Sequence, residues 1–66
     1  MARNIERRTA GRAQYLSFTI AGVQIMAARY RISNTTYSPW LVTQGDSALP
    51  ENAIKRGKYL SKLFTA

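Results

Sequence analysis

Residues 13–33 read AQYLSFTIAGVQIMAARYRIS and contain most of the apolar side chains of this 66-residue chain. Ala21 and Gly22, at the centre, suit a two-residue turn between two strands. The resulting register places apolar residues opposite one another on one face for three consecutive pairs, Ile20 with Val23, Phe18 with Ile25 and Leu16 with Ala27. The sequence therefore predicts an antiparallel β-hairpin over about residues 14–33.

The second half of this segment departs from the pattern. Tyr30 and Ile32 fall on the face opposite to the three apolar pairs. A β-bulge near residues 27–28 would return both side chains to the core, and it would point Arg29 and Arg31 toward solvent. We take this bulge as a working hypothesis.

Two other interpretations of residues 13–33 stay open. The alanines and the spacing of Leu16, Ile20 and Val23 are compatible with a helix, although Gly22 and the β-favouring residues around Thr19 oppose it. A membrane span is the third interpretation, because residues 13–28 carry no charge. A helix of that length reaches only about 24 Å, short of the ~30 Å hydrocarbon layer.

The rest of the chain predicts a third strand and a helix. Residues 40–43 form a short, mainly apolar run after Pro39. We expect this run to be the third strand of a small antiparallel meander. A C-terminal amphipathic helix is expected over about residues 48–64, with Asp46 and Ser47 as caps and Pro50 in the first turn. Its apolar side comprises Ala53, Ile54, Gly57, Leu60, Leu63 and Phe64. Gly57 costs helix stability, a cost that close packing of the helix on the sheet could offset.

Residues 1–12, MARNIERRTAGR, show no apolar periodicity and are expected to form a basic N-terminal arm. Residues 13–66 then make a single small domain of the α+β class. A domain of this size buries only about 60% of the surface that its unfolded chain exposes. A partner or a second copy is therefore expected to contribute to its stability.

The net charge of +7 is concentrated at the two ends of the chain. Eight of the ten basic residues lie within the first or the last twelve positions, and the middle of the chain is neutral. This distribution predicts contact with a polyanion. The candidate anion-binding residues are Arg3, Arg7, Arg8, Arg12, Arg29, Arg31, Lys55, Arg56, Lys58 and Lys62. Tyr30, Tyr37 and Trp40 are candidate stacking or docking groups, with Tyr15 as a further aromatic, although Trp40 also suits a lid over the core.

The residue inventory argues against catalysis. The chain has no histidine, no cysteine and only three carboxylates, so a nucleophile with an adjacent base is not predicted. We expect no enzyme activity, no metal site and no cofactor. The absence of cysteine slightly favours a reducing, intracellular location.

These features predict a non-catalytic basic subunit or accessory protein of a larger assembly. Its favoured partner is nucleic acid, bound through backbone phosphates. The alternative is a linker that bridges acidic protein subunits through charge complementarity, with a homo-oligomer as a further form of assembly. A membrane-associated or single-span subunit is the third and least favoured function.

Overall fold

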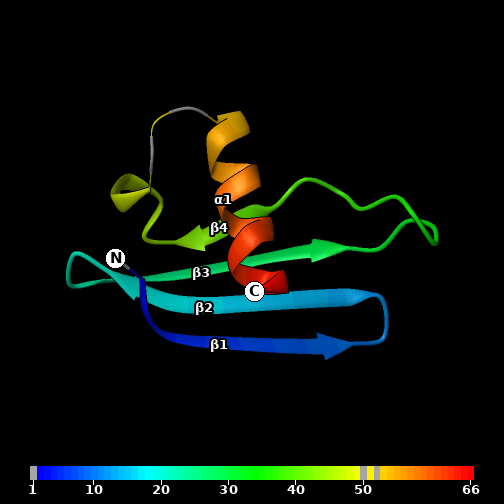
Figure 1. Ribbon diagram of the computed structural model, residues 1–66, viewed down its shortest axis with the longest axis horizontal. Helices are drawn as coiled ribbons and strands as arrows, with labels where there is room; N and C mark the ends of the chain where they lie inside the picture. Colours follow the sequence, from blue (N-terminus) through cyan, green and yellow to red (C-terminus); the bar gives the residue numbers. More distant parts are fainter. Residues whose placement is uncertain (1, 50, 52) are drawn as a thin grey trace.

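Four antiparallel strands lie side by side in chain order, and one helix crosses one face of the sheet (Figure 1). The structure is a computed structural model that describes residues 2–49, 51 and 53–66. Its strands are β1 (Arg3–Ala10), β2 (Ala13–Ile20), β3 (Val23–Tyr30) and β4 (Leu41–Gln44). A 3-10 helix, η1 (Asp46–Ala48), and the helix α1 (Ala53–Thr65) follow. The predicted α+β meander is confirmed.

The hairpin of β2 and β3 has the predicted register, with Phe18 paired to Ile25 and Leu16 to Ala27. Ala21 and Gly22 form its turn with φ of 51° and 77°, the positive values that a tight type I′ turn requires at both central residues. The helical and membrane-span interpretations of this segment are therefore wrong. No helix in the described ranges combines the length and apolarity needed to cross a bilayer.

The predicted bulge between β2 and β3 is absent, because their pairing continues without a shift from Ile20–Val23 to Ala13–Tyr30. The strand alternation therefore continues through Arg29, which is only 9% exposed on the helix side. Tyr30 and Ile32, expected in the core, are each 60% exposed. Arg29, Tyr30 and Ile32 thus lie opposite to the expectation, whereas Arg31 is exposed as expected. The aromatic rings around Arg29 make its burial tolerable. An irregularity does occur between Met26 and Ala27, but in the pairing of β3 with β4.

Residues 3–10 were expected to belong to an arm outside the domain, and they instead form the edge strand β1. β1 pairs with β2 from Ala10 to Arg3, with one register shift where Asn4 adopts a φ of 54°. Asparagine tolerates this left-handed conformation, and the shift lets Ile5 pack against the core. An edge strand has only one paired side, so it can form from a sequence with few apolar residues.

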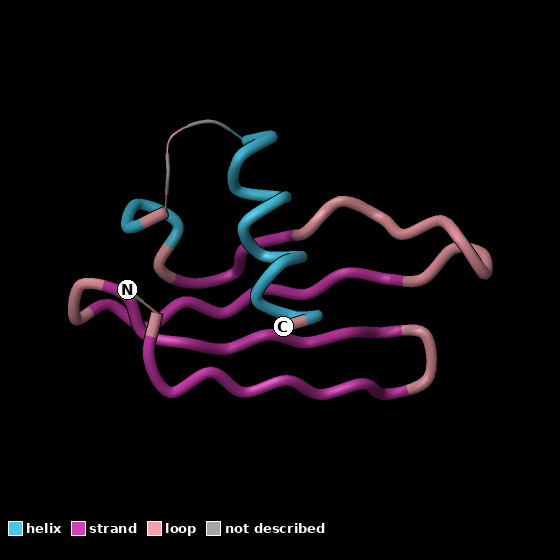
Figure 2. The backbone as a smooth tube through the Cα atoms, viewed as in Figure 1, coloured by secondary structure: helices cyan, strands magenta, loops and turns pink. Residues whose placement is uncertain are grey.

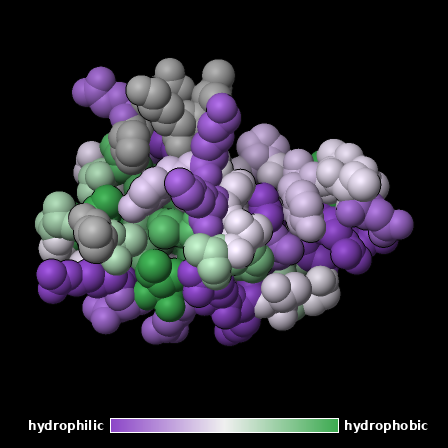
Figure 3. Space-filling view, in the orientation of Figure 1, coloured by the Kyte–Doolittle hydropathy of each residue, from purple (hydrophilic) through white to green (hydrophobic). Residues whose placement is uncertain are grey.

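The core lies between the sheet and α1. It is built from Leu16, Phe18, Ile25, Ala27, Leu49 and Leu60, with Trp40, Tyr59, Leu63 and Phe64 packed around it. α1 runs across the strands rather than along them, so it covers only the central part of this face (Figure 2). Hydrophobic surface is visible beside α1 toward the turn between β2 and β3, and hydrophilic side chains follow the β1 edge (Figure 3).

α1 begins at Ala53, five residues after the predicted start. Residues 46–48 form the separate turn η1 rather than leading directly into α1. Gly45, with a φ of 81°, directs the chain into this turn. Pro50 and the side chains of residues 53–55, including Ile54 and Lys55, lie outside the described part. No described atom lies within 4 Å of the position that a Cβ of Gly57 would occupy, so close packing does not offset the cost of this glycine.

Candidate nucleic-acid interface

The predicted anion-binding residues fall into groups that the structure separates. Arg7, Arg29 and Arg56 have partners within the fold: Arg7 Nε donates to the carbonyl oxygen of Leu63 over 2.7 Å, near the end of α1. This contact joins the edge strand to the helix C-terminus, where a cation is favourable. Lys58 and Lys62 are exposed on α1. The side chain of Lys55 is not described, and the remaining cations are Arg3, Arg8, Arg12 and Arg31.

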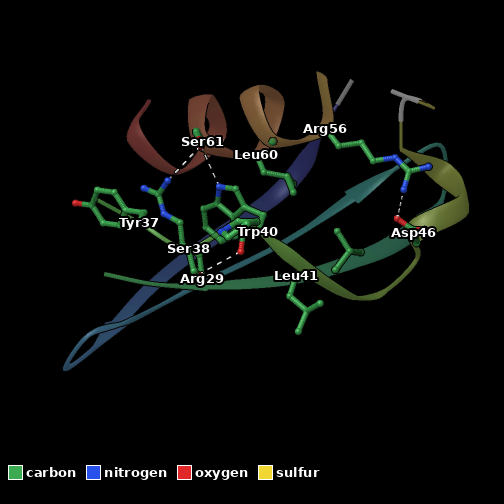
Figure 4. Close-up of a pocket in the computed structure, with 12 residues that line it drawn as sticks. Arg29, Tyr37, Ser38, Trp40, Leu41, Asp46, Arg56, Leu60 and Ser61 are labelled. Atoms are coloured by element: carbon green, nitrogen blue, oxygen red, sulfur yellow. Dashed lines mark hydrogen bonds and ion pairs between the residues drawn. The ribbon is translucent and has the colours of Figure 1, made fainter. Parts of the chain in front are cut away.

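Arg29 occupies an aromatic enclosure under α1 (Figure 4). Its guanidinium carbon lies 4.1 Å from the ring centroid of Tyr37 and 4.7 Å from that of Trp40, so the two rings flank the cation. Nε donates to Gln14 Oε1 over 2.7 Å, and Nη1 donates to Ser61 Oγ over 3.2 Å. These partners are neutral, and ring faces and neutral acceptors thus take the place of a carboxylate.

Arg29 and Trp40 therefore hold α1 on the sheet. Trp40 Nε1 also donates to Ser61 Oγ, over 3.0 Å, and the Trp40 ring packs on Phe64 at a centroid distance of 5.7 Å. Burial lowers the pKa of the Arg29 guanidinium from its ordinary value, and nearby Tyr37 acts in the opposite direction. Arginine nevertheless stays charged at physiological pH. Trp40 is a lid over the core here, and the solvent-exposed, anion-binding position expected for Arg29 is not observed.

A groove lies between α1 and β4, with Arg29, Trp40 and Leu60 along one part and Arg56 along another (Figure 4). Arg56 Nη1 forms an ion pair with Asp46 Oδ1 at 2.6 Å, which links α1 to η1. Gly57 lines this groove, and because glycine has no side chain it helps to keep the groove open. Its two cations are already engaged in the fold, so the groove is a weaker candidate for an anion site.

The sheet face opposite α1 is a stronger candidate. We call it the open face and define it by Arg3, Glu6, Arg8, Tyr15, Ser17, Thr19, Gln24, Met26, Ala28, Tyr30 and Leu41, which the strand pairing places on one side. Leu41 points away from α1 (Figure 4). Four large side chains remain substantially exposed on this face: Tyr15 at 37%, Met26 at 41%, Tyr30 at 60% and Leu41 at 69%.

Arg8 and Tyr15 form the central pair of the open face. They are partners across β1 and β2, and the Arg8 guanidinium lies 5.0 Å from the Tyr15 ring centroid. The same row continues to Ala28 on β3 and then to Leu41 on β4. A shallow depression extends from Arg8 and Tyr15 to Met26, with the small Ala28 in its floor. A cation, an aromatic ring and free space thus lie side by side.

Two more cations lie at one end of the sheet, outside the strands. Arg12 belongs to the turn between β1 and β2, and the backbone N–H of Arg31 donates to its carbonyl oxygen over 2.9 Å. Both residues are exposed. Arg3 lies toward the other end of β1, opposite Thr19. Glu6, between Arg3 and Arg8 along the strand, is the acidic residue of the face.

Some parts of this surface follow from the sequence and others do not. The sequence indicates Tyr15 and Tyr30 as candidate stacking groups, but it does not single out Met26 or Leu41. The alternation of Phe18, Ile25 and Ala27 as core residues could have identified Met26 as outward-facing. The side of Leu41 depends on the irregular pairing of β4, which no local pattern reveals.

The role of this surface has to be inferred from its own side chains, because three comparisons with known proteins found no match. No family model, no curated protein and no solved structure matches the chain. Within the described residues, no group of three or more acidic, histidine or cysteine side chains is placed to hold a metal ion. The absence of metal, cofactor and catalysis remains a prediction.

Proposed function

We propose that this protein is a non-catalytic basic subunit that binds nucleic acid through its open face, with arginines on the phosphate backbone. The observation that carries the proposal is the stacking of Arg8 over the half-exposed ring of Tyr15 on a face that α1 leaves uncovered. Arginine supplies a planar donor fork for phosphate, and tyrosine supplies a surface on which a base can lie.

The distribution of charge supports the same surface. Arg3, Arg8 and Arg12 follow β1 and its turn, and Arg31 adjoins Arg12 at the end of the sheet. Arg7, Arg29 and Arg56 are engaged within the fold, so we leave them out of the proposed contact set. Lys58 and Lys62 belong to the helix on the opposite side of the sheet. One short nucleic-acid segment therefore contacts either the arginines of the open face or the lysines of α1, but not both.

Binding of a labelled oligonucleotide, followed by fluorescence anisotropy at several salt concentrations, tests the proposal. Replacing Arg3 and Arg8 by glutamine removes two charges from the proposed site, and replacing Lys58 and Lys62 by glutamine removes two from α1. We expect the arginine variant to bind more weakly, with the slope of log affinity against log salt reduced by roughly 0.7–0.9 per lost phosphate contact. The lysine variant is the matched control and should bind as the unmodified protein does.

The opposite result, loss of binding in the lysine variant alone, would place the contact on α1 and contradict the proposed site. The alternative function, a linker between acidic protein subunits, is supported by the exposure of Ile32 and Leu41, at 60% and 69%. Poly-L-glutamate is a suitable probe for it. Binding of poly-L-glutamate with no binding of any oligonucleotide at low salt would replace nucleic acid by acidic protein as the partner class.

A further inference from the structure

We infer that the open face takes unpaired bases, so that the ligand is single-stranded nucleic acid rather than a duplex. This inference rests on the proposed function and specifies its substrate class. It also assigns Tyr15 and Tyr30 as the residues on which two bases stack.

The placement of the two tyrosines is the first argument. Tyr15 is paired with Ala28 on β3, and Tyr30 lies two residues beyond Ala28, so the tyrosines are diagonal neighbours on one face. Such neighbours are separated by about 7–8 Å, which leaves each ring with its own space. The partner of Tyr30 across the strands is Ala13, another small residue. Two rings flanked by alanines can each receive a planar group without displacing a bulky side chain.

The chemistry of stacking is the second argument. In a duplex, the faces of each base are covered by the bases above and below, whereas an unpaired base can turn its face to an aromatic ring. Arg8 already lies over Tyr15, and a guanidinium plane is itself a surface on which bases stack. The Arg8–Tyr15 pair therefore offers a layered platform that only an unpaired base can use.

The asymmetry of charge is the third argument. The arginines of the open face, Arg3 and Arg8, lie along β1, whereas the β4 side presents the apolar residue Leu41 and the β3 side presents Met26. A single strand has phosphates along one side and bases along the other, and it matches this arrangement. A duplex presents phosphates on both sides of each groove, and it would place some of them beside Leu41.

The width of the sheet is the fourth argument. Four strands at ~4.8 Å spacing extend about 14 Å between the outer backbones, before side chains are counted. The major groove of B-DNA is only ~12 Å wide and accommodates a helix or a two-stranded ribbon. The whole open face cannot enter it, so a duplex would reach only one edge of the sheet.

Anisotropy measurements with one labelled 12-nucleotide DNA strand, and with the same strand annealed to its complement, test the inference on the unmodified protein. We expect the single strand to bind at least about tenfold more tightly, because stacking of two bases is lost in the duplex. Equal or tighter binding of the duplex would overturn the inference while leaving the proposed function intact. Failure of both oligonucleotides to bind at low salt would instead overturn the proposed function.

Substitution of the tyrosines identifies the contacts. Tyr15→Leu and Tyr30→Leu should each weaken single-strand binding by roughly fivefold or more, with duplex binding and the salt slope unchanged. Tyr37→Leu is the matched control, because Tyr37 is 38% exposed, close to the 37% of Tyr15, but its ring lies against Arg29. Circular dichroism establishes that each variant is folded. Unchanged single-strand affinity in folded Tyr15 and Tyr30 variants would overturn the assignment.

Discussion

The guanidinium of Arg29 and the hydroxyl of Ser61 lie within hydrogen-bonding distance, at 3.2 Å, although 32 residues separate them in the chain. Ser61 accepts a second hydrogen bond from Trp40, so one small side chain on α1 joins the helix to both Arg29 and Trp40. This arrangement places a cation in the interior of the protein, whereas Arg3, Arg12 and Arg31 lie exposed on its surface. A role in stability, rather than in binding, follows for Arg29.

Replacing Arg29 by lysine tests that role. Lysine keeps the positive charge but loses the planar fork that reaches Gln14 and Ser61 together and stacks between two rings. We expect Arg29→Lys to lower the free energy of unfolding by about 1–3 kcal/mol, as for other changes that leave buried polar groups unpaired. Urea unfolding followed by Trp40 fluorescence measures it. A lysine variant as stable as the original protein would show that charge alone is sufficient at this position.

Gly45 is the glycine where a substitution should cost most. Its φ is 81°, and an added Cβ would meet the carbonyl oxygen of Gln24 and would lie 2.6 Å from Ile25 Cδ1. Gly45→Ala should therefore destabilise the protein by about 2–4 kcal/mol, because backbone strain and overpacking act together. Thermal unfolding by circular dichroism measures the loss. A change of less than about 0.5 kcal/mol would contradict the close approach of this turn to β3.

Gly57 should respond in the opposite direction to the same substitution. It lies inside α1, and nothing described is within 4 Å of the space for a Cβ. Gly57→Ala should stabilise the protein by about 0.5–1 kcal/mol, the usual difference between these residues in a helix interior. The same unfolding assay applies. Destabilisation would indicate that this part of the groove must stay free of a side chain.

Ala21 carries strain that a better turn residue would relieve. It adopts a φ of 51° beside Gly22, and Asn-Gly is the sequence most favoured in such turns. Ala21→Asn should raise the free energy of unfolding by about 0.5–1 kcal/mol. Ala10→Asn is a suitable control, since Ala10 lies in a strand, where asparagine is disfavoured. A gain at both positions would argue against turn strain as the cause.

Glu6 should oppose the binding of a polyanion. It lies on the open face between Arg3 and Arg8, where its charge repels phosphate. Glu6→Gln should increase oligonucleotide affinity by about two- to fivefold at about 50 mM salt, with the gain shrinking as salt rises. Glu51→Gln makes the same change in charge outside this face and serves as the control. Equal gains from both variants would point to net charge rather than to the open face.

Much of the sheet could be predicted because its information is local. The turn at Ala21 and Gly22 and the facing apolar pairs specify one register, and a shift by one residue would expose the whole apolar set. The strand β1 could not be predicted in the same way. Its only strong apolar residue is Ile5, and it forms because β2 offers a free edge. The pairing of β1 therefore depends on the free edge of β2 and not on an apolar pattern within β1.

The amino-acid sequence by itself determined the hairpin, its register, the presence of a C-terminal helix and the excess of positive charge. Tertiary structure alone decided which cations are free. Arg29 is buried because Trp40, Tyr37 and Ser61 converge on it from other elements, and Arg8 is exposed because α1 covers the other face. Local periodicity reports which side of a strand a residue occupies. It does not report which side a distant helix will cover, because that choice depends on the packing of the whole chain.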